Sequence, residues 1–289
     1  MPWCPKIQGM SAPAPTTCGF SRRAGLEFLT WPVFDPYPVQ AAVSTRHGGT
    51  SAGGYATLNL SFGVGDDPAA VLANRERVAA ALGTGLGSFV FAQQVHGAGV
   101  HVVTAADRGR GARTAADAIP GADALVTADP GTVLAILVAD CVPIVLYDPA
   151  AHLLACVHAG WRGTVARAAA AAVGALRGLG SRPEDLIAGI GPAIAPADFQ
   201  VGPEVAAKVE RAFGASAGTL LRPDSDGRWR LDLWAANRLT LGEAGLASEH
   251  IHVAAVPTGP GPGQFYSHRA AAPCGRFALV ARLEPRGDR

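Results

Sequence analysis

Four apolar segments follow one another closely in the middle of the chain, and they constrain the fold more than any other feature. They cover residues 124–127, 133–138, 143–147 and 153–157. Each has the length and composition of a buried strand. A crossover between parallel strands needs about a dozen residues or more, and these connections are too short to hold one. We therefore expect an α/β fold with mixed sheets, not a regular doubly wound sheet.

Other elements surround these segments. Asp67 and Pro68 suit the N-cap and first position of a helix that ends at Gly83. Residues 89–93 and 100–104 are expected to pair as a hairpin. Further strands are expected at 39–45, 186–190, 251–256 and 277–283, and further helices at 165–179, 203–213 and 232–244.

The ends of the chain differ in character. Residues 1–25 are predicted to be a poorly ordered extension without an apolar segment of signal-peptide type, and Met10 is an alternative start. Residues 26–289 are predicted to form a single catalytic domain.

Composition excludes several classes of protein. The formal net charge of +1 argues against a nucleic-acid-binding protein. The apolar run 133–138 is too short to cross a membrane. Five cysteines, an odd number without regular spacing, favour a reducing compartment, so we expect a cytoplasmic protein.

Three residues at expected strand ends could bind a metal ion. His158 follows the strand 153–157, His96 follows the strand 89–93, and Cys141 lies between two strands. Catalytic zinc commonly has three protein ligands of these types and one open position. The alternative is that both histidines make ordinary hydrogen bonds and the cysteine is buried. Cys156 competes with Cys141 as a ligand, although its apolar neighbours favour the core.

Several sequence blocks together resemble one known family. They are STRHGGTS at 44–51, Asn59-Leu60, VGDDP at 64–68, Asn74-Arg75, QVHG at 94–97, ADCVP at 139–143, HAGWRG at 158–163, GIGPAI at 189–194, SHR at 267–269 and Gly275-Arg276. The family is the multicopper polyphenol oxidase or laccase-domain family, which includes peptidoglycan editing factors and purine nucleoside phosphorylases. Two positions depart from its pattern, Pro257 and Ala270.

The resemblance implies one domain with α/β/β/α layers and one zinc ion held by His96, Cys141 and His158. It implies phosphorolysis of adenosine, inosine and methylthioadenosine, with adenosine deamination as a further activity. The expected partners are therefore a nucleoside and phosphate, with no nucleic acid, membrane or obligate protein partner. Copper in place of zinc, with polyphenol oxidase activity, is an alternative that the family name carries.

Further polar residues in these blocks are candidates for the reaction. Zinc lowers the pKa of bound water to about 7, and Asp140 is the adjacent carboxylate for proton transfer in a deamination. Arg46, in a glycine-rich loop, and Arg162, near a helix start, are candidates to bind phosphate. The alternative for Arg46 is that it only supports its loop. The remaining candidates for substrate contacts are Asn59, Gln94, His268 and Arg276.

A second function uses the same residues without a metal. Cys141 could be a nucleophile activated by His158 in an amidohydrolase that edits peptidoglycan. A binding protein without catalytic activity is the third alternative, and it does not account for the convergence of arginine, histidine, cysteine and aspartate.

Overall fold

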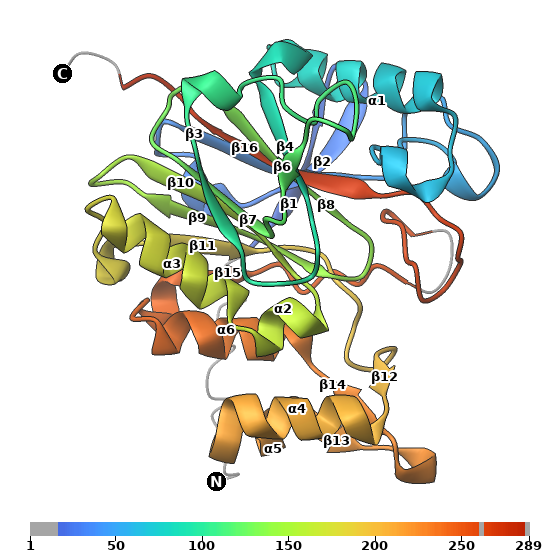
Figure 1. Cartoon of the computed structure of the whole chain (residues 1–289), viewed down its shortest axis with the longest axis vertical. Coiled ribbons are helices and arrows are strands. Elements are labelled where there is room, and N and C mark those ends of the chain that lie inside the picture. Colours follow the sequence, from blue (N-terminus) through green and yellow to red (C-terminus); the bar gives the residue numbers. More distant parts are fainter. Residues whose placement is uncertain (1–16, 260–262, 287–289) are drawn as a thin grey trace, which may run out of the picture.

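The structure is a computed structural model that describes residues 17–259 and 263–286. Two β-sheets stack face to face at its centre (Figure 1). The first sheet contains, in spatial order, β1 (Gly19–Arg23), β2 (Leu26–Thr30), β3 (Val39–Ser44), β16 (Phe277–Leu283), β8 (Val133–Val138), β4 (Phe89–Gln93) and β6 (Ile119–Pro120). The second contains, in spatial order, β15 (Ile251–Val253), β11 (Ile187–Ile190), β9 (Val142–Asp148), β10 (Leu153–Ala159), β7 (Ala124–Thr127) and β5 (Val100–Val103).

Both sheets are mixed. In the first sheet β4 runs parallel to β6 and β8, and the other pairs are antiparallel. In the second sheet β11 with β15 and β5 with β7 are parallel. Of the four close central segments, β8 belongs to the first sheet, whereas β7, β9 and β10 belong to the second. The connections on either side of β8 therefore cross from one sheet to the other, whereas β9 and β10 form an antiparallel pair within the second sheet.

Helices cover both outer faces. They are α1 (Pro68–Ala81), α2 (Trp161–Val165), α3 (Ala168–Gly178), α4 (Pro203–Phe213), α5 (Ala217–Leu220) and α6 (Leu233–Glu243). Figure 1 shows α1 on the outer side of the first sheet, and α2, α3 and α6 on the outer side of the second. The α/β/β/α arrangement predicted for the fold is confirmed.

Side-chain alternation explains why the layers stack. On β8, Leu134 and Ile136 pack into the core between the sheets, while Val133 and Ala135 pack against the layer that contains α1. A strand covered on both faces is apolar throughout, as the run 133–138 is. Burial of an aliphatic side chain of this size contributes about 1.5–3 kcal/mol, so these strands stabilise two layers at once.

A small third sheet lies beyond the helices of the second sheet. It consists of β12 (Gln200–Val201), β14 (Trp229–Leu231) and β13 (Leu221–Pro223), and it lies beside α4 and α5 (Figure 1). The expected helices 203–213 and 232–244 correspond to α4 and α6. The Asp232 side chain caps α6 by accepting a hydrogen bond from the backbone N–H of Ala235 at 2.9 Å.

The predicted hairpin of residues 89–93 with 100–104 is wrong. β4 belongs to the first sheet and β5 to the second. The connecting backbone turns at His96, whose φ is +60°. The carboxylate of Asp123 accepts hydrogen bonds from the backbone N–H groups of His96 and Gly97. The segment that leads from β4 in the first sheet to β5 in the second therefore bonds to Asp123 and not to a neighbouring strand.

Two other expectations need correction. The helix expected over 165–179 is interrupted, because Arg167 has a φ of +62° and separates α2 from α3. The guanidinium of Arg167 donates to the Ala212 carbonyl at 2.6 Å and forms an ion pair with Glu243, and these contacts hold the residue in place at the break. Residues 19–23 form β1, paired with β2, where a poorly ordered extension was expected. Residues 1–16, which include Met10, lie outside the described residues.

Two observations bear on the organisation of the chain. β16 lies between β3 and β8, so the first sheet joins strands from both ends of the described chain. The single domain predicted for residues 26–289 stays a prediction. Among the helices that the structure describes, none has the length and apolarity needed to cross a membrane.

Candidate metal centre and substrate cavity

The fold brings His96, Cys141 and His158 together. One ligand atom of each residue lies within 4.8 Å of those of the other two. The topology explains the convergence: β4 and β8 are parallel neighbours, so His96 and Cys141 follow them at the same edge of the first sheet. His158 lies near the end of β10, opposite Pro143 at the start of β9. The sequence-based expectation that these three side chains meet is confirmed.

Asp123 orients the buried histidine of the cluster. Its Oδ1 lies 2.8 Å from Nδ1 of His158, and the two side chains are 0% and 3% exposed. With Nδ1 bound to the carboxylate, Nε2 is the nitrogen of His158 that can bind a metal ion. Carboxylate–histidine pairs of this kind fix the ring orientation in metal sites.

The same carboxylate also shapes the backbone around His96. It accepts hydrogen bonds from the N–H groups of Val95 at 3.3 Å, His96 at 3.0 Å and Gly97 at 2.6 Å. His96 adopts a left-handed conformation that is uncommon for a residue with a side chain, and these bonds stabilise it. One buried carboxylate therefore positions two of the three candidate ligands.

Gly160 leaves the space that the cluster needs. A Cβ atom at this position would lie 2.7 Å from Sγ of Cys141 and 3.1 Å from Cδ2 of His96. Both distances are shorter than ordinary van der Waals contact. The chain thus has a thiol, two imidazoles and room around them, which fits the ligand chemistry of zinc.

The ionisable groups of the cluster shift one another's pKa values. Burial would raise the pKa of Cys141, but the adjacent His158 and His96 outweigh it and lower this pKa to about 6. Burial would lower the pKa of His158, but Cys141 and Asp123 raise it to about 9. Burial also opposes ionisation of Asp123, yet hydrogen bonds from His158 and Gly97 lower its pKa. Cys141 is therefore a thiolate at neutral pH, which is the form that binds metals and attacks electrophiles.

Cys156 is not part of the cluster. It is fully buried in the core between the sheets, where burial raises its pKa. This agrees with the sequence-based preference for Cys141.

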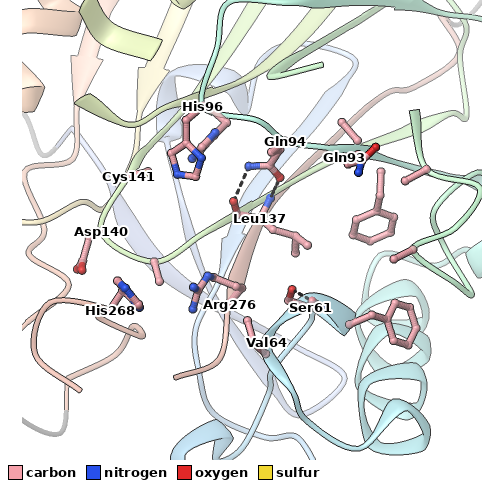
Figure 2. A pocket seen from close by; sticks show the side chains of 18 of the residues that line it. Ser61, Val64, Gln93, Gln94, His96, Leu137, Asp140, Cys141, His268 and Arg276 are labelled. Atoms are coloured by element: carbon pink, nitrogen blue, oxygen red, sulfur yellow. Dashed lines mark hydrogen bonds between the residues drawn. The ribbon is translucent and has the colours of Figure 1, made fainter. Parts of the chain in front are cut away.

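A cavity of about 720 Å³ opens beside the cluster (Figure 2). Its lining includes all three candidate ligands and five of the other residues singled out from the sequence. These five are Gln94, Asp140, Arg162, His268 and Arg276. Figure 2 shows His96, Cys141, Asp140 and His268 toward one end of the cavity, with Arg276 and Gln94 nearer its middle.

Asp140 connects two segments of the cavity wall. Its carboxylate accepts hydrogen bonds from the Thr258 hydroxyl at 2.6 Å and from the backbone N–H of Arg269 at 2.7 Å. Its own backbone has a φ of +79°. Asp140 therefore holds the segment that carries His268 and Arg269 against the strand end that carries Cys141.

Gln94 and Arg162 are also positioned by local contacts. The Gln94 amide donates to the Leu137 carbonyl and accepts from its N–H, both at 2.8 Å (Figure 2). This side chain ties the end of β4 to the end of β8. The guanidinium of Arg162 lies 4.5 Å from the ring centroid of Trp161, and both residues line the cavity.

The structure places Arg46 and Asn59 outside the cavity lining. The Arg46 guanidinium donates twice to the Ala56 carbonyl, at 3.1 and 2.8 Å, and lies 4.6 Å from the ring centroid of Tyr266. Asn59 is fully buried, and its Oδ1 accepts a hydrogen bond from the backbone N–H of Arg276 at 2.9 Å. Arg46 thus supports its loop, and Asn59 positions Arg276 indirectly.

Sequence reasoning missed three residues of the site. Asp123 was not identified, although an aspartate directly before the strand 124–127 is the kind of strand-end carboxylate that can orient a ligand. Arg75 and Arg269 line the cavity but carried no assigned role. Both belong to the motif blocks quoted above, and only their positions in space distinguish them from structural arginines.

Comparison with known proteins gives consistent matches. Residues 40–284 match the family model described as multi-copper polyphenol oxidoreductase laccase. The chain is 40% identical over 230 residues to the purine nucleoside phosphorylase YlmD of Geobacillus stearothermophilus, covering 79% of this chain and 84% of that one. It is 45% identical over 211 residues to a purine nucleoside phosphorylase of Deinococcus radiodurans, covering 72% and 76%.

Solved structures agree with these matches. The crystal structure of YlmD from Geobacillus stearothermophilus superposes with a TM-score of 0.87 at 37% identity, covering 92% of this chain and 99% of that chain. A Bacillus licheniformis hypothetical protein, YfiH, gives a TM-score of 0.86 at 34% identity, covering 89% and 96%.

Proposed function

This chain belongs to the multi-copper polyphenol oxidoreductase laccase family, and we propose that it is a metal-dependent purine nucleoside phosphorylase. Relatives that are 40% and 45% identical carry the name purine nucleoside phosphorylase. We propose adenosine, inosine and methylthioadenosine as its substrates, with deamination of adenosine as a further activity.

One observation carries the proposal. A single cavity contains the three candidate metal ligands together with Arg162, His268 and Arg276. Phosphorolysis needs an anion-binding group close to a bound nucleoside, and guanidinium groups are suited to phosphate oxygens. The cavity, of about 720 Å³, is within the size range of small-molecule sites, which is about 300–1,000 Å³.

His96, Cys141 and His158 would hold one zinc ion. A zinc ion bound there supplies Lewis-acid chemistry by polarising an oxygen atom of substrate or water. The chain's own contribution is the orientation of His158 by Asp123 and the space left by Gly160.

In the proposed phosphorolysis, the two arginines and the histidine of the cavity share one role, and Asp140 has another. Arg162, Arg276 and His268 would bind the phosphate, so that one of its oxygens attacks C1′ of the ribose. The bond from C1′ to the purine nitrogen breaks, and its electron pair leaves with the base. We assign Asp140 a positioning task, because its carboxylate is engaged by Thr258 and by the backbone of Arg269.

A second candidate function has its own supporting observation. Cys141, His158 and Asp123 form a chain of neighbouring thiolate, imidazole and carboxylate groups. Such a set is typical of enzymes with a cysteine nucleophile, and it would suit the amidohydrolase alternative. Polyphenol oxidation with copper is the alternative that the family description suggests.

Two measurements test the proposal. A panel of nucleosides is incubated with and without phosphate, and products are identified by mass. Free base with ribose 1-phosphate, formed only with phosphate, supports phosphorolysis. Metal analysis of untagged protein should find about one zinc per chain. Rapid inactivation of metal-free, active protein by iodoacetamide would instead support the cysteine nucleophile, and copper with oxidation of phenols would support the laccase reading.

A further inference from the structure

The cavity extends well beyond the metal ligands. We call its remote part the far lobe, and its residues are Ser61, Phe62, Val64, Arg75, Phe91 and Gln93. Figure 2 shows Gln93, Ser61 and Val64 on the side of the cavity away from Cys141. Strand residues advance about 3.3 Å each, so Phe91 on β4 lies roughly 10 Å along the strand from Gln94. A ligand whose base lies near the metal cluster would therefore direct its other end toward the far lobe.

Arg75 brings a buried positive charge into this lobe. The residue is 3% exposed. Its Nε donates to the Leu60 carbonyl at 2.7 Å, and its Nη1 donates to the carbonyls of Gly111 at 2.5 Å and Ala112 at 3.0 Å. Within residues 17–259 and 263–286, no carboxylate forms an ion pair with Arg75, and no hydrogen bond uses its Nη2. The fixed guanidinium therefore has one nitrogen left for a ligand.

The guanidinium of Arg75 packs against both aromatic rings of the far lobe. The guanidinium carbon of Arg75 lies 4.4 Å from the ring centroid of Phe62 and 3.8 Å from that of Phe91. These cation–π contacts cover one face of each ring. A base stacked between the two rings would have to displace Arg75. The far lobe therefore presents a positive charge to a ligand, and it has no free space between the two rings where a base could stack.

The net charge of the whole cavity lining is also positive, which favours an anionic ligand. Among the residues that the structure describes, the cavity is lined by one carboxylate, Asp140, and four arginines, which are Arg75, Arg162, Arg269 and Arg276. None of the four forms an ion pair with another described residue. A phosphate group carries about −1.5 to −2 charges near pH 7. One phosphate near Arg162 and Arg276 would leave the positive charge of the far lobe uncompensated.

We propose that the far lobe is a second anion subsite, which binds a phosphate or carboxylate group carried by the substrate at its end remote from the base. This inference rests on the proposed function, because it identifies the class of nucleoside that the cavity prefers. Nucleosides with an anionic group on the 5′ side of the ribose bind more tightly than the neutral nucleosides proposed above, which the cavity also accepts, and Arg75 is the specificity-determining residue.

The first test compares ligands on the intact protein. Binding of adenosine, methylthioadenosine, adenosine 5′-monophosphate and adenosine 5′-carboxylate is measured by calorimetry without phosphate. We expect one or both anionic compounds to bind at least about tenfold more tightly than both neutral ones, since each would gain a charge-assisted hydrogen bond. The phosphate and carboxylate compounds together show which anion the lobe prefers.

The second test changes the charge of the lobe. Arg75 supports three backbone carbonyls, so its removal endangers folding, whereas Gln93 is exposed. Gln93→Glu should abolish the preference for the anionic ligands by adding an opposing charge, and the matched Gln93→Ala variant should keep it. Melting temperatures of both variants should stay near that of the wild type.

Three results would overturn the proposal. The first is tighter or equal binding of the neutral nucleosides, with methylthioadenosine favoured by an apolar lobe. The second is a Gln93→Glu variant that keeps the anion preference. The third is a higher KM for inorganic phosphate with adenosine in Gln93→Glu, which would place the co-substrate in the far lobe. Anion-dependent binding without phosphorolysis of any nucleoside would contradict the proposed function alone.

Discussion

Gly160→Ala should weaken metal binding at the cluster without disturbing the fold. Gly160 has a φ of −71° and a ψ of 173°, which alanine adopts freely, so the substitution adds no backbone strain. The only change is a methyl group 2.7 Å from Sγ of Cys141 and 3.1 Å from Cδ2 of His96. The consequence should therefore appear at these two candidate ligands.

The size of the effect follows from the distances. Carbon and sulfur need at least about 3.5 Å of separation, so the sulfur or the Gly160 backbone must move by roughly 0.8 Å. Zinc sites tolerate deviations of only about 0.2 Å in ligand distance. Overpacking of this kind costs about 1–3 kcal/mol, which corresponds to a loss of about 5- to 150-fold in metal affinity.

The measurement is a competition between protein and a chelator, followed by the metal content per chain. Gly174→Ala is the matched control, because Gly174 lies within α3 and a Cβ there meets nothing within 4 Å. The control should keep its metal affinity, and its melting temperature should be unchanged or slightly higher. Metal affinity of Gly160→Ala within about twofold of wild type would refute the assignment of Cys141 and His96 as ligands.

The other predictions concern the surroundings of the cluster. Asp123→Asn should lower metal affinity about 10- to 100-fold, and a metal titration that shows no loss would exclude its orienting role. Cys141→Ala should lose metal and activity with little change in melting temperature, whereas Cys156→Ala should keep metal and lose about 1–2 kcal/mol of stability; equal metal loss in both would contradict the assignment. Arg46→Ala should lower phosphorolysis and deamination together, along with the melting temperature, and a selective loss of phosphorolysis would restore a role in phosphate binding. Because the pKa of His158 is raised to about 9, its imidazolium must lose a proton to bind a metal; measured affinity should rise about tenfold per pH unit between pH 7 and 8, and a flat profile would contradict this.

Local sequence signals predicted the individual elements well. The N-cap Asp67 with Pro68 marked the start of α1, and the apolar run 133–138 corresponds to β8. These signals succeed because capping and side-chain periodicity depend on residues that are neighbours in the chain. The ligand residues were also within reach, since histidine and cysteine at strand ends are unusual and the motif blocks resemble those of a known family.

The partners of these elements depended on tertiary structure. Residues 89–93 and 100–104 have the pattern of a hairpin, yet they lie in different sheets. Strand pairing joins residues that are distant in sequence, and the apolar pattern of a strand does not specify which sheet it enters. The parallel pairing of β4 with β8 in the first sheet is what places His96 beside Cys141.

The arginines show the same division most clearly. By itself, the sequence determined the fold class, most helices and strands, and the residues able to bind a metal. It did not distinguish Arg46, which supports a loop, from Arg75, which brings its guanidinium to the cavity. Nor did it identify Asp123 as the carboxylate that holds His158. Those roles depend on distance and burial, because the pKa and the bonding partners of an ionisable side chain are set by the groups that folding places around it.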